Sequence, residues 1–281
     1  MQGFWPNLFP DFGSRTLIMG VLNVTPDSFS DGGQYFDVAS AIERGLKMVS
    51  EGADLIDVGG ESTRPGAALI SEDEELKRII PVIRGLRDHV PLSIDTNKAT
   101  VARVVAEEGA SIINDISAGH FDPQIRSVVA QKGLGYMMMH ARAKPESMQL
   151  GEWIYDGGVV AAVRASLAQS AEKAQDAGIP QDRLMIDPGF GFGKTLDENC
   201  LLLQHLDELH TLKLPILVGT SKKSFLGKLT DKTVENRGFA TVASISLAAA
   251  KGASMVRVHD IDSSRDALRV VDACTRPFIC D

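Results

Sequence analysis

The sequence predicts a single-domain (β/α)8 TIM barrel. Eight short apolar or β-branched runs alternate along the chain with longer segments of helical periodicity, which is the pattern of repeated strand–helix units. Most of the runs stay apolar over several consecutive residues, as is typical of parallel strands buried on both faces. The length of 281 residues also suits one such barrel. A doubly wound open sheet with an added half is the alternative.

The expected strands are short and spread along the whole chain. The first, LIMGVLNV, follows an N-terminal extension of residues 1–15, and the last is SMVRVH. No linker, low-complexity tract or repeat divides the chain, so we expect one domain. The eight runs cover residues 17–24, 54–60, 91–96, 111–116, 134–140, 184–189, 215–220 and 254–259.

Helical patterns fill the segments between the strands. Asp37 is a suitable N-cap for the first helix, apolar residues recur at helical spacing over 38–49, and Gly52 is expected to end it. Residues 71–74 form a capping-box pattern, and Pro81 is expected to bend that second helix or to end a shorter one. The remaining helices are expected at 98–108, 122–132, 157–177, 196–210, 235–251 and 262–275.

Composition and charge limit the partners of the chain. Hydrophobic residues make up 44% and charged residues 23% of it, which is ordinary for a soluble globular enzyme. The formal net charge is −8, so we expect no nucleic-acid partner and no anionic membrane surface. An anionic ligand would need a local cluster of Arg, Lys and His side chains.

The cysteines and the N-terminus favour a cytoplasmic protein. Cys200, Cys274 and Cys280 are too few and too scattered for a disulfide framework or a zinc knuckle, so reduced thiols are expected. The first 15 residues show no basic region followed by an apolar run, and no stretch of about 20 apolar residues could span a membrane.

Polar side chains gather at the carboxyl ends of the expected strands. In a barrel these ends share one rim, where barrel enzymes keep their active sites. His140 follows three methionines, and we interpret it as a buried histidine with satisfied hydrogen bonds. The rim residues are Asn23, Glu61 to Arg64, Asp95, Asn114, His140, Asp187, Ser221 to Ser224, Arg257 and His259.

The stretch DPGFGFGKT, residues 187–195, matches a phosphate-binding P-loop only in part. A P-loop needs a glycine, four residues and then Gly-Lys-Ser/Thr. Pro188 stands where the first glycine should be, and proline has no N–H to donate to a phosphate. We therefore expect a tight glycine turn after the sixth strand, with Asp187 facing the mouth of the barrel.

Two carboxylates and one amide on this rim suit a flat heterocycle. Asp95 or Asp187 alone could simply cap the helix that follows it. Together with Asn114, however, they can accept hydrogen bonds from an amidine-like edge and offer both a donor and an acceptor. This set suits the 2-amino-4-oxo edge of a pterin or a guanine.

The loops after strands seven and eight are the usual phosphate site of this fold. Lys222 and Lys223 open the first of these loops, although they could also be a solvated pair, and Arg257 and His259 end strand eight. A guanidinium fork and an imidazole donor suit a diphosphate. Asn23 could contact a Mg²⁺ ion held mainly by that diphosphate, since magnesium prefers a few protein oxygens plus phosphate and water.

The chain resembles the dihydropteroate synthase family over nearly its whole length. The resemblance implies condensation of 6-hydroxymethyl-dihydropterin diphosphate with p-aminobenzoate, giving dihydropteroate and diphosphate in folate synthesis. It also implies a homodimer joined through outer helices away from the mouth. Five blocks carry it in order: GVLNVTPDSFSDGG (20–33), DVGGESTRPG (57–66), INDIS (113–117), DPGFGFGK (187–194) and VRVHD (256–260).

The resemblance also implies residue roles. The pterin would be held by Asp95, Asn114, Asp187 and Lys223. The diphosphate and Mg²⁺ would be held by Asn23, Arg257 and His259, and catalysis would rest on Lys223, Arg257 and His259. The p-aminobenzoate pocket would be bordered by Thr63, Arg64, Pro65, Phe190 and Ser224. The loops at 25–33 and 61–66 would close over the site and exclude water.

The resemblance implies a loose, dissociative displacement at the pterin methylene. The diphosphate departs with its electrons, so Arg257, His259 and Mg²⁺ would stabilise the charge that grows on it. The arylamine attacks with a free lone pair, and this explains the lack of a Ser-His-Asp or Cys-His arrangement.

Three stretches depart from the usual pattern of the family. Asn97 stands where serine is common, and Arg142 and Lys144 lie in a stretch that usually reads His-Met, one variable residue, then Gly. Lys222 stands where arginine is usual. Lysine keeps the charge but lacks the planar fork that stacking and bidentate contacts need.

Three other functions remain open. A methyltetrahydrofolate–corrinoid methyltransferase barrel would share the pterin-edge groups, but it has no evident use for STRPG or for Arg257 with His259. A Schiff-base aldolase would use Lys223 as its nucleophile. A non-catalytic pterin-binding module would bind the pterin and form no product.

Overall fold

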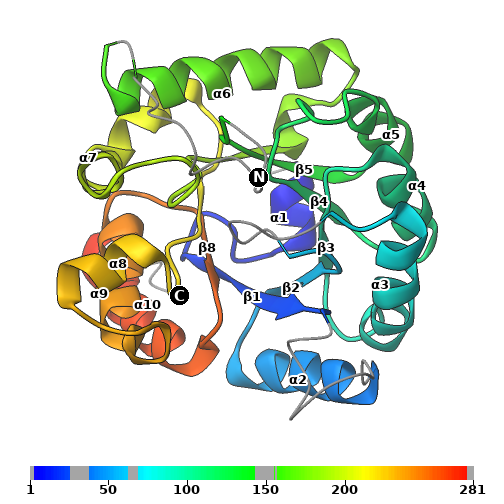
Figure 1. Cartoon of the computed structure of the whole chain (residues 1–281), viewed down its shortest axis with the longest axis horizontal. Helices are drawn as coiled ribbons and strands as arrows, with labels where there is room; N and C mark the ends of the chain where they lie inside the picture. The colour runs from blue at the N-terminus through cyan, green and yellow to red at the C-terminus, as the bar shows by residue number, and fades with distance from the viewer. Residues whose placement is uncertain (1–2, 26–37, 63–68, 143–154, 156, 277–281) are drawn as a thin grey trace.

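A computed structural model of the chain describes residues 3–25, 38–62, 69–142, 155 and 157–276. Eight parallel strands form its centre, and helices surround them (Figure 1). Each strand lies within one of the eight apolar runs that predicted it. The strands are β1 Leu17–Asn23, β2 Leu55–Gly59, β3 Leu92–Asp95, β4 Ile112–Asp115, β5 Gly135–Met139, β6 Leu184–Asp187, β7 Leu217–Val218 and β8 Met255–Val258.

The sheet closes into a barrel. Its strand order is β6-β5-β4-β3-β2-β1-β8-β7, and every pair of neighbours in that order is parallel. The two ends of this order meet through a parallel bridge between Ile186 and Ile216. Strands that follow one another around a closed ring confirm the predicted TIM barrel, because a doubly wound sheet reverses its order at a switch point and leaves two free edges.

Helices follow the strands around the outside of the barrel (Figure 1). Two predicted helices are divided: a 3-10 helix at Leu206–Leu212 follows α7, and another at Val234–Asn236 precedes α9. Helix α8 was not predicted as a separate element. The helices around the ring are α2 Val38–Glu51, α3 Glu72–Leu86, α4 Ala99–Glu107, α5 Gln124–Lys132, α6 Val159–Asp176, α7 Leu196–Gln204, α8 Ser224–Thr230, α9 Gly238–Ala250 and α10 Ile261–Thr275.

Local signals explain where several helices begin and end. The Ser71 side chain accepts a hydrogen bond from the Glu74 N–H at the start of α3, as the capping pattern predicted. This helix runs on through Pro81 to Leu86, so the proline does not end it. Gly52, with φ +108°, follows the last residue of α2 as expected. Asp37 lies outside the described residues.

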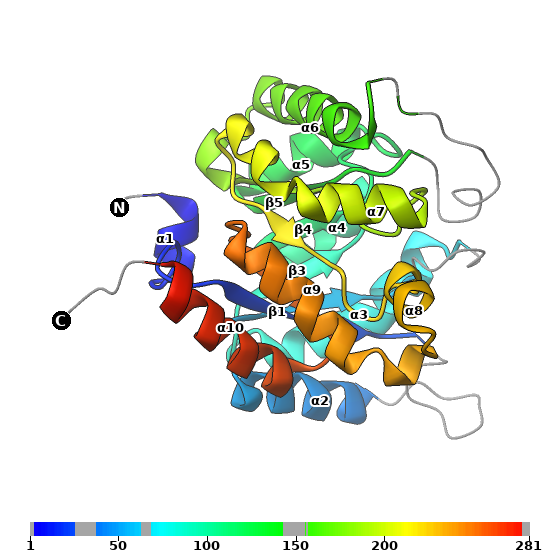
Figure 2. The ribbon, with the colours of Figure 1, turned by 90° about the vertical axis from the view of Figure 1, so that its left-hand side faces the viewer.

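The amino ends of the strands are covered by a short helix that the sequence analysis missed, α1 Phe4–Leu8. It lies at one end of the barrel, opposite α8 (Figure 2). Trp5 is only 2% exposed, and its indole N–H donates to the Leu184 carbonyl at 3.2 Å. Trp5 and Phe9 pack against the apolar layer inside the barrel. That layer is Leu17, Met19, Leu55, Ile112, Met137, Met185, Leu217 and Met255.

The structure also bears on the predictions about cysteines and membranes. Cys200 and Cys274 carry free thiols, as expected, whereas Cys280 lies outside the described residues. Within the described part of the chain, no helix is both long enough and apolar enough to cross a membrane.

Candidate active site

A hydrogen-bonded network joins the carboxyl ends of four strands. The Arg257 Nε donates to Asp57 Oδ2 at 2.6 Å, and its Nη2 donates to Asp95 Oδ2 at 2.9 Å. The Asn114 amide donates to the same Asp57 oxygen at 3.0 Å. Strands β2, β3, β4 and β8 each supply one member, so the rim brings Asp95, Asn114 and Arg257 together as predicted.

Asp57 is the member of this network that the sequence analysis missed. It has no solvent exposure, and its second oxygen, Oδ1, has no hydrogen-bond partner among the described residues. A usable signal was present, because Asp57 interrupts the apolar run of β2. A buried carboxylate in a strand interior needs a charged or hydrogen-bonding partner, and that partner here is Arg257.

Two glycines on the rim keep the polar side chains close together. A Cβ atom placed on Gly59 would lie 3.7 Å from Asn23 Oδ1 and 3.8 Å from Asp95 Oδ2. A Cβ atom on Gly219, just after β7, would lie 3.8 Å from both Arg257 Cβ and Asp187 Oδ2. Asn23 and Asp187 therefore lie close to members of the network, at the same mouth.

Burial shifts the protonation of the acidic residues in this site. Burial raises the pKa of Asp95 to about 7, against the opposing charge of Arg257. Burial also raises the pKa of Asp187, while the Gly189 N–H, 2.7 Å from its Oδ1, and the positive charge of Lys223 oppose the shift. Both carboxyl groups are therefore poorly solvated, and N–H donors from a ligand would favour their ionised forms.

The basic residues of the site show the complementary shifts. Burial and the positive charge of Arg257 lower the pKa of Lys223 to about 8. Although burial disfavours the charge of Arg257, Asp57 and Asp95 raise its pKa overall. The Lys223 ammonium lies 4.1 Å from the centre of the Phe192 ring, a cation–π contact that holds it at the start of α8.

His259 links the loops that follow strands seven and eight. Its Nδ1 lies 2.9 Å from Ser221 Oγ, and its carbonyl accepts from Arg44 Nη2 at 3.0 Å. His259 and Arg257 come from the same end of β8, so the predicted anion-binding pair lies on one side of the mouth. Lys222, also predicted in this loop, is held through its backbone. It has φ +58°, and its N–H donates to Thr241 Oγ1.

The residues predicted around p-aminobenzoate are only partly described. Phe190 is 1% exposed, and its ring stacks on Phe225 with centroids 6.2 Å apart. Ser224 is exposed at the first position of α8. Thr63, Arg64 and Pro65 lie outside the described residues, so their predicted role in this pocket stays a prediction.

Glu61, predicted on the rim, makes its contacts within the protein. Its carboxylate lies 3.0 Å from the Lys98 ammonium and accepts from the Ile70 N–H at 2.8 Å. Lys98 also pairs with the buried Glu75 at 2.7 Å. Glu61 therefore ties the end of β2 to the start of α4.

The stretch DPGFGFGK forms a glycine turn whose lysine points inward. Gly189, Gly191 and Gly193 have φ of +70°, +80° and +63°, a region that favours glycine. The Lys194 ammonium donates to the Gly189 carbonyl at 2.7 Å and lies 3.1 Å from His140 Nδ1. The stretch thus forms the predicted glycine turn after β6, with its lysine engaged inside the turn.

His140 is a buried histidine, as interpreted from the sequence. It is 6% exposed, and burial together with the charges of Lys194 and Arg142 lowers its pKa to about 3. The ring is therefore neutral. Arg142, one of the departures from the family pattern, lies 4.1 Å from the centre of the Tyr155 ring, and Lys144 lies outside the described residues.

Asn23 has the chemistry of a magnesium contact but not of a complete metal site. Among the described residues, no group of three or more His, Cys, Asp or Glu side chains could hold a metal ion. A single neutral amide oxygen suits Mg²⁺ when phosphate oxygens and water complete its octahedron. The space over Gly59, beside Asn23 Oδ1, is compatible with such a contact.

Comparisons with known proteins agree with this geometry. The sequence pattern of a family described as pterin binding enzyme matches residues 19–259. The dihydropteroate synthase of Synechocystis sp. is 43% identical over 270 residues, which cover 95% of this chain and 92% of that protein. A dihydropteroate synthase structure from Clostridium difficile in the presence of pteroic acid has a TM-score of 0.89 at 40% identity, covering 95% of this chain and 99% of that one.

A further structural relative is the Yersinia pestis dihydropteroate synthase in complex with a sulfonamide drug. It has a TM-score of 0.87 and 44% identity, and the match covers 93% of this chain and 94% of that one. Fold and rim thus define an enzyme barrel that binds a pterin, and the chain belongs to the pterin binding enzyme family. Within that family, the relatives named here are dihydropteroate synthases.

Proposed function

We propose that the chain joins 6-hydroxymethyl-7,8-dihydropterin diphosphate to p-aminobenzoate, giving 7,8-dihydropteroate and diphosphate, as a dihydropteroate synthase does. The observation that carries this proposal is the network in which Arg257 bridges Asp57 and Asp95 while Asn114 binds Asp57. It supports the proposal because carboxylate and amide groups, which would accept from a pterin edge, lie directly beside a cation that would stabilise the departing group.

The pterin would be bound by Asp95, Asn114, Asp187 and Lys223. Because the Asn114 amide group donates to Asp57, its carbonyl oxygen is left to accept from the ligand. Asp95 and Asp187 would accept the ring and amino N–H groups, and the Lys223 ammonium would donate to a ring acceptor. A guanidinium or purine edge with the wrong donor order would leave buried carboxylates unpaired, which costs binding energy.

The reaction balances without a nucleophilic residue of the protein. The bond between the pterin methylene carbon and the diphosphate oxygen breaks, and its electron pair leaves with the oxygen. The p-aminobenzoate nitrogen forms the new bond with its lone pair and then loses a proton to solvent. Arg257 and His259 would stabilise the charge on the departing oxygen. Mg²⁺, held by Asn23 and the diphosphate, would add Lewis-acid stabilisation.

The p-aminobenzoate would lie beside the turn after β6 and the start of α8. Ser224 is exposed there, and the buried Phe190–Phe225 pair would form the floor beneath it. We propose Thr63, Arg64 and Pro65 as the opposite wall, on the strength of the STRPG block in the sequence.

The test is a two-substrate assay with the purified chain and Mg²⁺. Diphosphate release should require p-aminobenzoate, and dihydropteroate should accumulate in equal amount by mass spectrometry. Diphosphate release without p-aminobenzoate would contradict the proposal. Tight pterin binding without product would favour the binding module, and methyl transfer to a corrinoid protein would favour the methyltransferase. Borohydride trapping of a carbonyl substrate on Lys223 would favour the aldolase.

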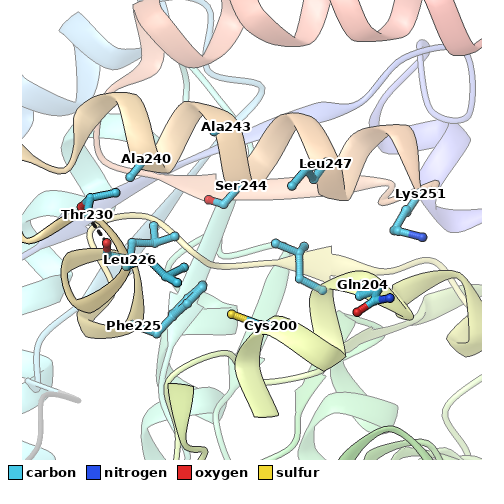
Figure 3. A pocket seen from close by; sticks show the side chains of 12 residues that line it. Cys200, Gln204, Phe225, Leu226, Thr230, Ala240, Ala243, Ser244, Leu247 and Lys251 are labelled. Carbon is cyan, nitrogen blue, oxygen red and sulfur yellow. Dashed lines mark hydrogen bonds between the residues drawn. The ribbon is translucent and has the colours of Figure 1, made fainter. Parts of the chain in front are cut away.

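We further propose that two copies of the chain associate through the outer face of α7, α8 and α9. Four large apolar side chains are exposed on these helices: Leu201 by 45%, Leu229 by 55%, Phe239 by 93% and Leu247 by 55%. Two of them, Leu229 and Leu247, line a cavity of about 450 Å³ between the three helices. Figure 3 shows Leu226, Phe225 and Leu247 among its lining side chains.

An exposed apolar face of this kind is typical of a protein interface. We propose a second copy of the chain as the partner because, in a two-fold dimer, the same face of each copy packs against itself. Sedimentation should show a dimer, and Phe239→Glu should shift it toward the monomer. An unchanged monomer in both proteins would overturn this proposal.

A further inference from the structure

The Lys194 ammonium is enclosed by the turn that carries it. Its Nζ donates to the carbonyls of Gly189 at 2.7 Å and Phe192 at 3.3 Å, and it lies 3.1 Å from His140 Nδ1. The His140 carbonyl is 3.5 Å away. An ammonium has three N–H donors, so these acceptors use all of them.

His140 is the acceptor in its contact with Lys194. Because the ring is neutral, with a pKa lowered to about 3 by burial and nearby cations, one ring nitrogen can accept. The Lys194 contact assigns that role to Nδ1 and the proton to Nε2. Lys194 thereby fastens the turn after β6 to the end of the neighbouring strand β5.

The two closer carbonyls bound by Lys194 are those of Gly189 and Phe192. Both of these residues also contact residues proposed to bind the pterin. The Gly189 N–H donates to Asp187 Oδ1 at 2.7 Å, so this glycine links Lys194 to one acid of the site. The Phe192 ring lies beneath the Lys223 ammonium at 4.1 Å, so this phenylalanine links Lys194 to the base.

Besides Lys194, the Phe192 N–H donates to the Gly189 carbonyl at 3.2 Å and the Tyr155 hydroxyl donates to the Gly193 carbonyl at 3.3 Å. The glycines of the turn, at 189, 191 and 193, all have positive φ, and glycine loses more conformational freedom on ordering than any other residue. Asn199 holds the outer side, because its Oδ1 accepts from the Gly191 N–H at 2.7 Å and its amide donates to the Lys194 carbonyl at 3.1 Å. Lys194 holds the inner side, next to the site.

The donors of Lys194 matter more than its charge. Burial lowers the pKa of Lys194 to about 7, with Lys223 and Arg142 acting in the same direction and Asp187 and Glu198 opposing it. Near neutral pH the amine therefore loses its third proton readily. A neutral amine still has two N–H groups, which is enough for the two shortest contacts, to Gly189 and His140.

We propose that Lys194 is a positioning residue for the pterin: it holds the turn 189–193 so that Asp187 and Lys223 face the ligand in register. The proposal rests on the proposed function, since it assumes that those two residues bind the pterin. Lys194 contacts Gly189 and Phe192, which in turn contact Asp187 and Lys223, and its positive charge also opposes the burial that raises the pKa of Asp187.

The experiment compares Lys194→Met, which keeps the length but has no donor, with Lys194→Gln, which keeps two N–H donors. Lys228→Met, at an exposed lysine of α8, is the matched control. The measurements are the melting temperature, kcat and KM for both substrates, and the Kd for 6-hydroxymethylpterin by fluorescence titration. Assays are run well below each melting temperature.

Lys194→Met should lower kcat/KM for the pterin substrate between about tenfold and a hundredfold, as expected when reacting groups are misplaced by roughly 1 Å. It should also weaken 6-hydroxymethylpterin binding, and the KM for p-aminobenzoate should change less. Lys194→Gln should recover part of the loss, and Lys228→Met should stay within twofold of the parent.

The proposal is overturned if folded Lys194→Met keeps both kcat/KM and pterin affinity within twofold of the parent. It is also overturned if only the fraction of active protein falls, because that is the result of lost stability alone. If Lys194→Met does not fold, Lys194→Gln decides by the same criterion. If the parent protein binds the pterin but forms no product, the proposed function fails, while the binding titration still tests Lys194.

Discussion

The two ends of this barrel are built from the same strands and have opposite character. At the amino end, Trp5 and Phe9 cover a layer of leucine, isoleucine and methionine side chains. At the carboxyl end, Asp57, Asp95 and Arg257 form a buried ionic network. One end is an ordinary apolar core, whereas the other holds charges that are taken out of water.

This contrast separates the sources of stability and function. Burying apolar side chains stabilises a fold by about 25 cal/mol per Å² removed from water, but buried ion pairs often gain no more than their desolvation costs. We therefore expect changes at the carboxyl end to affect chemistry most, with an added loss of stability where Asp57 or Asp95 is left unpaired, and changes at the amino end to affect folding and not chemistry.

The largest effect is expected for Arg257→Ala. Its guanidinium is the only group that joins Asp57 and Asp95 in the described network, and it is proposed to stabilise the leaving diphosphate. Turnover should fall by about 10²- to 10³-fold, as is typical when a preorganised donor to developing charge is removed. Steady-state diphosphate release measures this.

Lys222→Ala is the matched change on the same side of the mouth. Lys222 is half-buried, and its described hydrogen bonds come from its backbone, so turnover should fall only a few-fold. Equal losses in the two variants would show that the anion site is wrongly assigned.

Trp5→Ala tests the other end of the barrel. Removing a buried aromatic ring costs about 3–5 kcal/mol of unfolding free energy, and here the Leu184 hydrogen bond is lost as well. Urea unfolding should show the loss, while kcat of the folded protein should stay within twofold of the parent. A large fall in kcat at unchanged stability would break the separation between the ends.

The pH dependence of activity and stability should run in opposite directions. In the proposed function, Asp95, with a pKa of about 7, would accept from the pterin only when ionised, and Lys223, with a pKa of about 8, would donate only when protonated. The kcat/KM for the pterin substrate should therefore peak between these values. The pH–rate profile measures both limbs.

Stability follows from the same two shifts. The folded state binds the Asp95 proton more tightly than the unfolded state, so this contribution to stability is lost as pH rises toward about 7. It binds the Lys223 proton less tightly, so stability is regained above about 8. These two residues therefore make the unfolding free energy lowest between about pH 7 and pH 8, where activity is highest. Urea titrations at several pH values measure it, and an unfolding free energy that is highest in this range would show that the assignment is wrong.

Asp57→Asn should give the smallest of these effects and sharpen the comparison. The negative charge of Asp57 is one of the causes that raise the pKa of Asp95, so its removal should move the acid limb of the pH–rate profile to lower pH. An unmoved limb would mean that Asp95 does not control it. The amide should still accept from Arg257, and turnover should fall less than in Arg257→Ala.

The sequence allowed the barrel and much of its rim to be predicted, for a physical reason. Parallel strands buried on both faces must be apolar along their length, so the eight runs stood out. Polar residues at their ends stood out against these runs, and Asp95 and Arg257 do meet there with Asn114, whereas Glu61 ties β2 to α4 instead. Asp57 was missed although it lies within its strand just as Asn114 and Arg257 do, and its polar side chain in the apolar run of β2 was the signal.

Other features depend on tertiary contacts that a local pattern cannot reveal. Helix α1 has only five residues and exists because Trp5 finds the open end of the barrel. Lys194 reads as an ordinary basic residue after a glycine turn, and only the fold shows it pointing inward. The Phe190 ring, in the turn after β6, stacks on Phe225, which lies on α8.

The seam of the barrel has a consequence for its motions. Strand β7 pairs with β8 over only two residues and reaches β6 through a single bridge between Ile186 and Ile216. Amide hydrogens along this seam should exchange with deuterium sooner than those of β1 and β2, because local opening begins where few backbone bonds must break. We therefore expect the seam, which carries Asp187 at the end of β6 and leads through β7 to Lys223, to open locally before β1 and β2 do.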